Sequence, residues 1–133
     1  MKTLKHIASV PESGVEVVTE GTLTRIFFDF TDLEHPVSEE GMEHPELPAD
    51  LKACENVDVE GRSYSGIVSA IINDRYPQDA NQALNANYQL AKDAESELSD
   101  EKRAEYLDEY ASFQDWRSHA KKIAATVVAI LAE

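Results

Sequence analysis

The segment 99–133, SDEKRAEYLDEYASFQDWRSHAKKIAATVVAILAE, decides the fold of this chain. Ser99 is a favourable N-cap residue, and Asp100 and Glu101 follow in the first turn, where carboxylates interact well with the helix dipole. Apolar residues then recur at helical spacing along one face: Tyr106, Tyr110, Phe113, Trp116, Ala120, Ile123, Val127 and Ile130. This periodicity predicts a single long amphipathic helix of about seven turns.

Two shorter helices are predicted before it. The first begins near Ser63 and ends at Pro77, which cannot continue a helix. Its apolar stripe is Tyr64, Ile67, Val68, Ile71 and Ile72. The second is predicted to begin at Asp79, because Gln82 follows three residues later in a capping-box pattern. Its expected stripe is Ala80, Leu84, Ala91, Ala94 and Leu98.

The first half of the chain has the pattern of a small antiparallel sheet. Residues 15–18 and 23–30 are rich in β-branched and aromatic residues and flank a turn that contains Gly21, which predicts a hairpin. Alternation in the second run favours Thr24, Ile26, Phe28 and Phe30 as the core face. Residues 4–10, ended by Pro11, and residues 56–60, ended by Gly61, are predicted as further short strands. Residues 31–51 contain three prolines and are predicted to be a loop.

These elements predict an α+β fold, with a small N-terminal antiparallel sheet followed by three helices, the last one long. The chain has 133 residues, of which 42% are hydrophobic, enough for one core and a single domain. Residues 1–62 would form its β-rich part, with the acidic loop 31–51, and residues 63–133 its helical part. We expect the sheet to pack on the helices, because an isolated hairpin is only marginally stable in water.

The charge of the chain limits its partners. The formal net charge is −14, from 26 acidic and 12 basic residues. Residues 31–60 contain ten of the acids and one base, Lys52. So negative a surface repels phosphate groups, and we therefore expect no nucleic-acid and no membrane partner. The acidic segment 31–60 also suggests an alternative function. The protein would then be an inhibitor or decoy that mimics nucleic acid and occupies a basic protein surface.

The compartment is predicted by elimination. Cys54 is the single cysteine, so an intrachain disulfide is excluded and a reducing compartment fits. The first residues lack the apolar core of a signal peptide. The longest apolar run, residues 123–132, is far shorter than the roughly 20 residues that a membrane span needs. We expect a cytoplasmic protein, or one carried in a virion if it is a phage structural component.

Candidate catalytic and metal-binding residues have simpler explanations. His35 and His44 lie among five glutamates that could bind a divalent metal, but a run of charge is usually a solvated loop. The acids around Cys54 would raise its thiol pKa, which favours a structural role over a nucleophilic one. His119 has no nucleophile in the pattern around it. No catalytic residue, cofactor or metal site is predicted, and an enzyme with an unfamiliar site is the least favoured hypothesis.

The end of the last helix, residues 123–131, is apolar on more than one face. Such a helix has neighbours on more than one side, so either the sheet or a second copy of the chain covers the additional face. Tyr and Trp also favour interfaces. The predicted interface residues are Tyr106, Tyr110, Phe113, Trp116, Ile123, Val127, Ile130 and Leu131, with most of the stripe in the core and its rim at the interface. Charged residues in place of Val127 and Ile130 would then break a homo-oligomer.

Residues 64–122 also carry a resemblance. The run Tyr64-Ser65-Gly66-Ile67-Val68-Ser69-Ala70-Ile71-Ile72-Asn73-Asp74-Arg75-Tyr76 precedes a helical segment that ends Phe113-Gln114-Asp115-Trp116-Arg117-Ser118-His119-Ala120-Lys121-Lys122. This block resembles small uncharacterised proteins encoded by phages and prophages of gut Bacteroidetes. The resemblance implies a virion, tail-associated or accessory role and brings no catalytic residues. Together these observations favour a non-enzymatic interaction or structural module that binds itself or another phage-type protein through its C-terminal helix.

Overall fold

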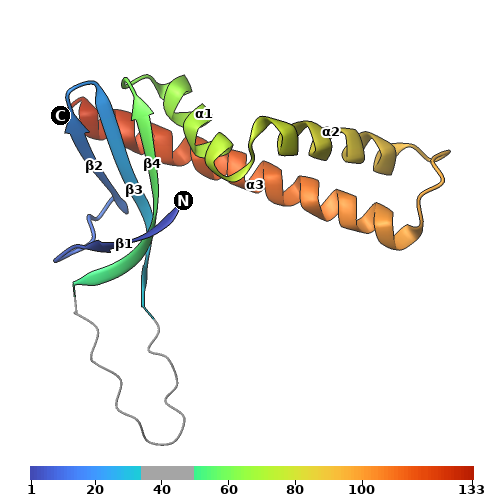
Figure 1. Cartoon of the computed structure of the whole chain (residues 1–133), viewed down its shortest axis with the longest axis horizontal. Coiled ribbons are helices and arrows are strands. Elements are labelled where there is room, and N and C mark those ends of the chain that lie inside the picture. Colours follow the sequence, from blue (N-terminus) through green and yellow to red (C-terminus); the bar gives the residue numbers. More distant parts are fainter. Residues whose placement is uncertain (34–49) are drawn as a thin grey trace, which may run out of the picture. The chain divides into compact units, whose positions relative to one another are not determined.

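The computed structural model describes residues 1–33 and 50–133 of the chain (Figure 1). Among these residues four strands come first: β1 (Lys2–His6), β2 (Val15–Glu20), β3 (Leu23–Asp32) and β4 (Leu51–Glu60). Three helices follow: α1 (Tyr64–Arg75), α2 (Gln78–Lys92) and α3 (Asp100–Leu131). This order of elements confirms the predicted α+β fold, with a long last helix of 32 residues.

The strands form an antiparallel sheet in the order β1-β4-β3-β2. β2 and β3 make the predicted hairpin, in which Glu20 pairs with Leu23 across a two-residue loop. The first loop residue, Gly21, has φ +60°. A positive φ at that position is the pattern of a type II′ turn, whose twist matches the twist of the strands. Glycine adopts this conformation without the steric cost that other residues carry.

One face of the sheet is the core face that alternation predicted. Thr24, Ile26 and Phe28 of β3 are buried. The prediction is wrong for Phe30, which is half-buried, because the pairing with β4 shifts by one residue after Phe28 and Thr31 takes the next place on this face. Ile26 pairs with Val57 of β4, and both side chains are buried. The hydroxyl of Thr24 donates a hydrogen bond of 2.7 Å to the carbonyl of Gly61, so this buried polar group is satisfied.

On the opposite face, the side chain of Lys5 in β1 extends toward β3 and β2. Its Nζ lies 4.2 Å from the centre of the Phe27 ring and 3.7 Å from a carboxylate oxygen of Glu16 in β2. A lysine placed in this way covers apolar surface with its stem and keeps its charge paired. The second face is therefore partly covered by polar side chains and is not a second apolar core.

The structure corrects the predicted strand bounds. β1 covers residues 2–6, where residues 4–10 were predicted, and β4 begins at residue 51, five residues before the prediction. Backbone pairing decides both, because Lys2 to His6 pair one by one with Glu55 to Leu51. The predicted loop 31–51 is also too long, since β3 continues to Asp32. Its residues 34–49 lie outside the described part of the chain.

β3 reaches Asp32 through a bulge. Its pairing with β4 shifts between Phe28 and Thr31, and Asp29 within this interval has φ +55°. An additional residue on one strand turns the following side chains to the other face and increases the local twist. Beyond the bulge Asp32 lies opposite Lys52, with which it forms an ion pair.

Two of the three predicted helix starts are confirmed by their caps. The hydroxyl of Ser63 accepts a hydrogen bond from the backbone N–H of Gly66 at 3.1 Å, and that of Ser99 accepts one from Lys102 at 3.1 Å. Each serine thus satisfies one of the backbone donors that a helix leaves unpaired at its start.

The predicted bounds of the second helix are wrong at both ends. α2 begins at Gln78 directly after Pro77, whose carbonyl accepts the first helical hydrogen bond from Asn81 at 3.0 Å. Asp79 is therefore a first-turn residue and not the cap. A proline fits the start of a helix because the N–H it lacks would have no partner there. α2 ends at Lys92, so Ala94 and Leu98 lie in the connection and outside the stripe.

Arg103 of α3 holds the end of α2. Its guanidinium donates hydrogen bonds to the carbonyl of Ala91 at 2.6 Å and that of Asp93 at 3.0 Å, and to the hydroxyl of Ser96 at 3.2 Å. The last carbonyls of a helix have no partner within the helix, and a cation is favourable beside them. This arginine therefore anchors the α2–α3 connection.

The chain divides into two compact units. One contains residues 1–62 together with residues 126–133, so the last turns of α3 belong with the sheet. Its buried side chains include Val15, Ile26, Phe28, Val57, Val59 and Val127. The other contains residues 63–125, and its buried apolar side chains are Ile67, Ile71, Ala91, Phe113, Trp116, Ala120, Ile123 and Ala124.

Candidate functional site

The structure places the eight predicted interface residues in two groups. Phe113, Trp116, Ile123 and Val127 are buried within the chain itself, and Val127 is 0% exposed. The other four are half-buried: Tyr106, Tyr110, Ile130 and Leu131. The buried group packs the interior of the two units. Association with a partner requires side chains that solvent can reach, which the four buried residues do not offer.

Trp116 is fully engaged inside the helical unit. Its indole Nε1 donates a hydrogen bond of 3.1 Å to the carbonyl of Ile71 in α1. The guanidinium carbon of Arg75 lies 3.5 Å from the ring centre, and the His119 ring lies 5.5 Å from it. A cation over an indole face is favourable. His119 therefore packs beside Trp116 in the helical unit.

Nearer the start of α3, an aromatic pair joins α2 to α3. The rings of Tyr88 and Tyr110 are stacked with centres 3.8 Å apart and planes 9° apart. Phe113 meets Tyr76 edge to face at 5.0 Å. Aromatic pairs of this kind add stability beyond the area that they bury. Tyr110 is therefore occupied largely by contacts inside the unit.

The outer side of the last turns of α3 is apolar and exposed. Val128 is 36% exposed, and Ala129 and Ala132 beside it are exposed as well. We call these three residues the outer patch. They share a face because residues three and four apart are neighbours on a helix. Val127, which precedes Val128 and lies about 100° from it around the helix, is buried in the same unit as the sheet. The sequence signal for this patch was the apolar character of residues 123–131 on more than one face.

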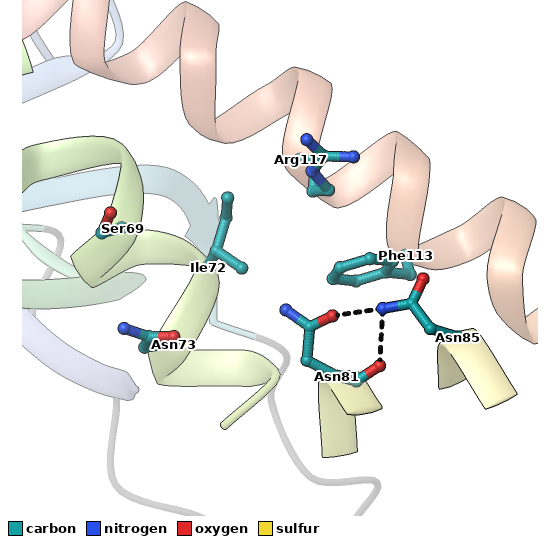
Figure 2. A pocket seen from close by; sticks show the side chains of 7 residues that line it. All are labelled: Ser69, Ile72, Asn73, Asn81, Asn85, Phe113 and Arg117. Carbon is teal, nitrogen blue, oxygen red and sulfur yellow. Dashed lines mark hydrogen bonds between the residues drawn. The ribbon is translucent and has the colours of Figure 1, made fainter. Parts of the chain in front are cut away.

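The helical unit contains a polar hollow of about 430 Å³ (Figure 2). Figure 2 shows side chains from all three helices around it: Ser69, Ile72 and Asn73 from α1, Asn81 and Asn85 from α2, and Phe113 and Arg117 from α3. We call it the amide hollow. Its volume lies in the range of small-molecule sites. Sequence analysis missed it, because the residues come from three helices and match no motif.

The polar groups of the amide hollow are partly oriented by one another. The Asn85 side-chain nitrogen donates to the backbone carbonyl and to the side-chain oxygen of Asn81, both at 3.0 Å. Arg117 donates to the side-chain oxygen of Gln114 at 3.0 Å, and its guanidinium lies 5.8 Å from the Phe113 ring centre. The hollow thus combines amide groups, one guanidinium, and apolar surface from Phe113 and Ile72.

Cys54 is buried in β4. Burial is the main cause that raises the pKa of its thiol, and Glu55 and Glu16 raise it further, while Lys5 acts in the opposite direction. The raised pKa agrees with the sequence prediction, but its larger cause is desolvation and not the neighbouring acids. A buried thiol held in its neutral form is a poor nucleophile.

Three further features concern metals and membranes. His35 and His44, with the glutamates around them, lie outside the described residues. Within residues 1–33 and 50–133, no three His, Cys, Asp or Glu side chains are grouped so that they could hold a metal ion. In the same ranges, none of the helices combines the length and the apolar character that crossing a membrane requires.

Comparison with models of known protein families, with curated protein sequences and with solved structures finds no match.

Proposed function

We propose that the protein is a non-enzymatic interaction or structural module that self-associates through the C-terminal end of α3. The observation that carries the proposal is the outer patch, where Val128 is 36% exposed although its neighbour Val127 on the same helix is fully buried. An apolar surface on both sides of a helix favours a neighbour on each side. The small side chains of Ala129 and Ala132 would let a second helix approach closely.

A second copy of the chain is the proposed partner. The three residues of the outer patch carry no charge, although the chain carries a net charge of −14. Contact elsewhere between two such acidic surfaces is opposed by repulsion. The resemblance of residues 64–122 supports a virion, tail-associated or accessory role for this module, with another phage-type protein as a further partner.

The test is the mass in solution, measured by light scattering on a sizing column at low and high salt. We expect a species larger than the 14.8 kDa chain, stable in high salt because the contact is apolar. Val128→Glu should reduce it to 14.8 kDa without loss of helix content. Val127 is unsuitable for this test, because a charge at a fully buried position would unfold the chain.

Leu90→Glu is the matched control, since it introduces the same charge at an exposed apolar residue of α2. It should leave the mass of the assembly unchanged. A wild-type protein that stays at the mass of one chain at all concentrations would refute the proposal. Equal loss of assembly in both variants would show that added charge, and not the outer patch, is responsible.

A further inference from the structure

The amide hollow continues into a second depression in the same helical unit, of about 550 Å³. The two share Asn73 and Asn81, and the second adds Gln78 and Gln82 of α2. Gln78, Asn81, Gln82 and Asn85 are spaced by three and four residues, which places their side chains on one face of α2. A continuous row of amides therefore lines one side of this concave surface.

The composition of this surface differs from that of the rest of the chain. The sequence contains 26 acidic residues, yet none of those in residues 1–33 and 50–133 lines either depression. It contains nine asparagines and glutamines, and five of them do. Asparagine is a poor helix former, so Asn81 and Asn85 inside α2 reduce its intrinsic stability. An exposed helix face serving only solubility would be better composed of Glu and Lys.

Arg117 gives the amide hollow a single positive charge. Within residues 1–33 and 50–133, no carboxylate lies within salt-bridge distance of its guanidinium, and its one hydrogen bond there is to the neutral side chain of Gln114. The side chain is half-buried beside the buried Phe113 ring. An arginine in this setting can still present paired N–H groups to a carboxylate.

We propose that the amide hollow binds a small sugar that carries one carboxylate group. Each amide offers both a donor and an acceptor, which matches sugar hydroxyls because a hydroxyl also donates and accepts. Asn85 already donates to the side-chain oxygen of Asn81, which leaves the nitrogen of Asn81 and the oxygen of Asn85 to bind sugar hydroxyls. Arg117 binds the carboxylate, and the half-buried Ile72 contacts the ring carbons. Ligands with several negative charges are disfavoured by the net charge of −14.

The experiment is a two-dimensional NMR titration of the full-length protein with three probes: glucuronate, glucose and acetate. Glucuronate has both parts of the proposed ligand, whereas glucose lacks the carboxylate and acetate lacks the hydroxyl groups. We expect glucuronate to bind most tightly and to shift the side-chain signals of Asn81 and Asn85. No shift with glucuronate, or shifts elsewhere only, overturns the proposal. Acetate binding as tightly as glucuronate overturns it too, because it indicates simple anion attraction.

Two variants assign the roles. Arg117→Gln should weaken glucuronate binding about tenfold and leave glucose binding unchanged, since it removes one charge-assisted interaction. Asn81→Ala should weaken the binding of both glucuronate and glucose. Arg62→Gln and Asn87→Ala are the controls, because they remove the same groups at positions that line neither depression. Unchanged affinity in Arg117→Gln with an intact fold would overturn the assignment, as would equal losses in the controls.

Discussion

The indole nitrogen of Trp116 on α3 donates a hydrogen bond of 3.1 Å to the backbone carbonyl of Ile71 on α1, 45 residues earlier in the chain. Both residues are buried, and Ile71 is 0% exposed. The bond fixes the rotation of α3 relative to α1, because a direct indole contact requires one particular face of each helix. Phe113, one turn before Trp116 on α3, and Arg117, directly after it, line the amide hollow.

We expect Trp116→Phe to lower the free energy of unfolding by about 1–2 kcal/mol. The change removes one buried hydrogen bond and part of the buried ring surface. Urea denaturation followed by circular dichroism measures the effect, since Trp116 is the single tryptophan and cannot serve as its own probe. Tyr110→Phe is the control, because the Tyr110 hydroxyl makes no hydrogen bond within the described residues, and its effect should be near zero. Equal losses in the two variants would show that the indole bond contributes nothing specific.

The cap at Ser99 should contribute about 1 kcal/mol to stability, so Ser99→Ala should lower the melting temperature. The variant leaves the backbone N–H of Lys102 without its side-chain acceptor. Ser99→Asp should retain the stability, because a carboxylate accepts the same bond and favours the helix dipole. Ser118→Ala, an exposed position inside α3, should be neutral or slightly stabilising because alanine is the better helix former. A loss at Ser118 equal to that at Ser99 would argue against the cap.

The ion pair between Asp32 and Lys52 should make one small part of the stability depend on pH. The hydrogen bond from Lys52 is the main cause that holds the pKa of the Asp32 carboxyl below its ordinary value, and the lysine charge adds to it. For a lowered pKa, the stabilisation is present above the unfolded-state pKa near 3.8 and is lost as the pH falls through the folded-state pKa. The difference in melting temperature between wild type and Asp32→Asn should therefore decrease toward zero in acid.

The effect at Asp32 should be modest, because the carboxyl is exposed and solvent screens the pair. Asp108→Asn removes the same charge from an exposed position of α3 that has no ion pair among the described residues. The difference in melting temperature between wild type and Asp108→Asn should not decrease in acid. If wild type and Asp32→Asn differ by the same amount at every pH, the pair does not contribute to folding.

Local signals in the sequence predicted most of the secondary structure. Ser63 and Ser99 are caps in the structure as their residue type and position predicted. The alternation of Thr24, Ile26 and Phe28 identified the buried face of β3, because side chains of a strand alternate between its two faces. Such features depend on neighbours within a few residues, and those neighbours are visible in the chain itself.

The errors arose where distant pairing decides. The bounds of β1 follow from the partners that β4 supplies about 50 residues later, and the bulge at Asp29 sets where β3 ends. Arg103 holds the end of α2 only after the connection has folded back onto it. None of these contacts leaves a periodic signal near the residues that make them.

The sequence by itself determined the class of fold, the order of its elements and the apolar surplus at the end of α3, because hydrophobic periodicity and capping are properties of short segments. Only the tertiary structure decided which side of that helix is covered. It buried Val127 and left Val128 exposed, two neighbours of identical chemistry. It alone also brought Asn73, Asn81 and Arg117 to one hollow, because packing three helices sets side by side residues that the chain keeps far apart.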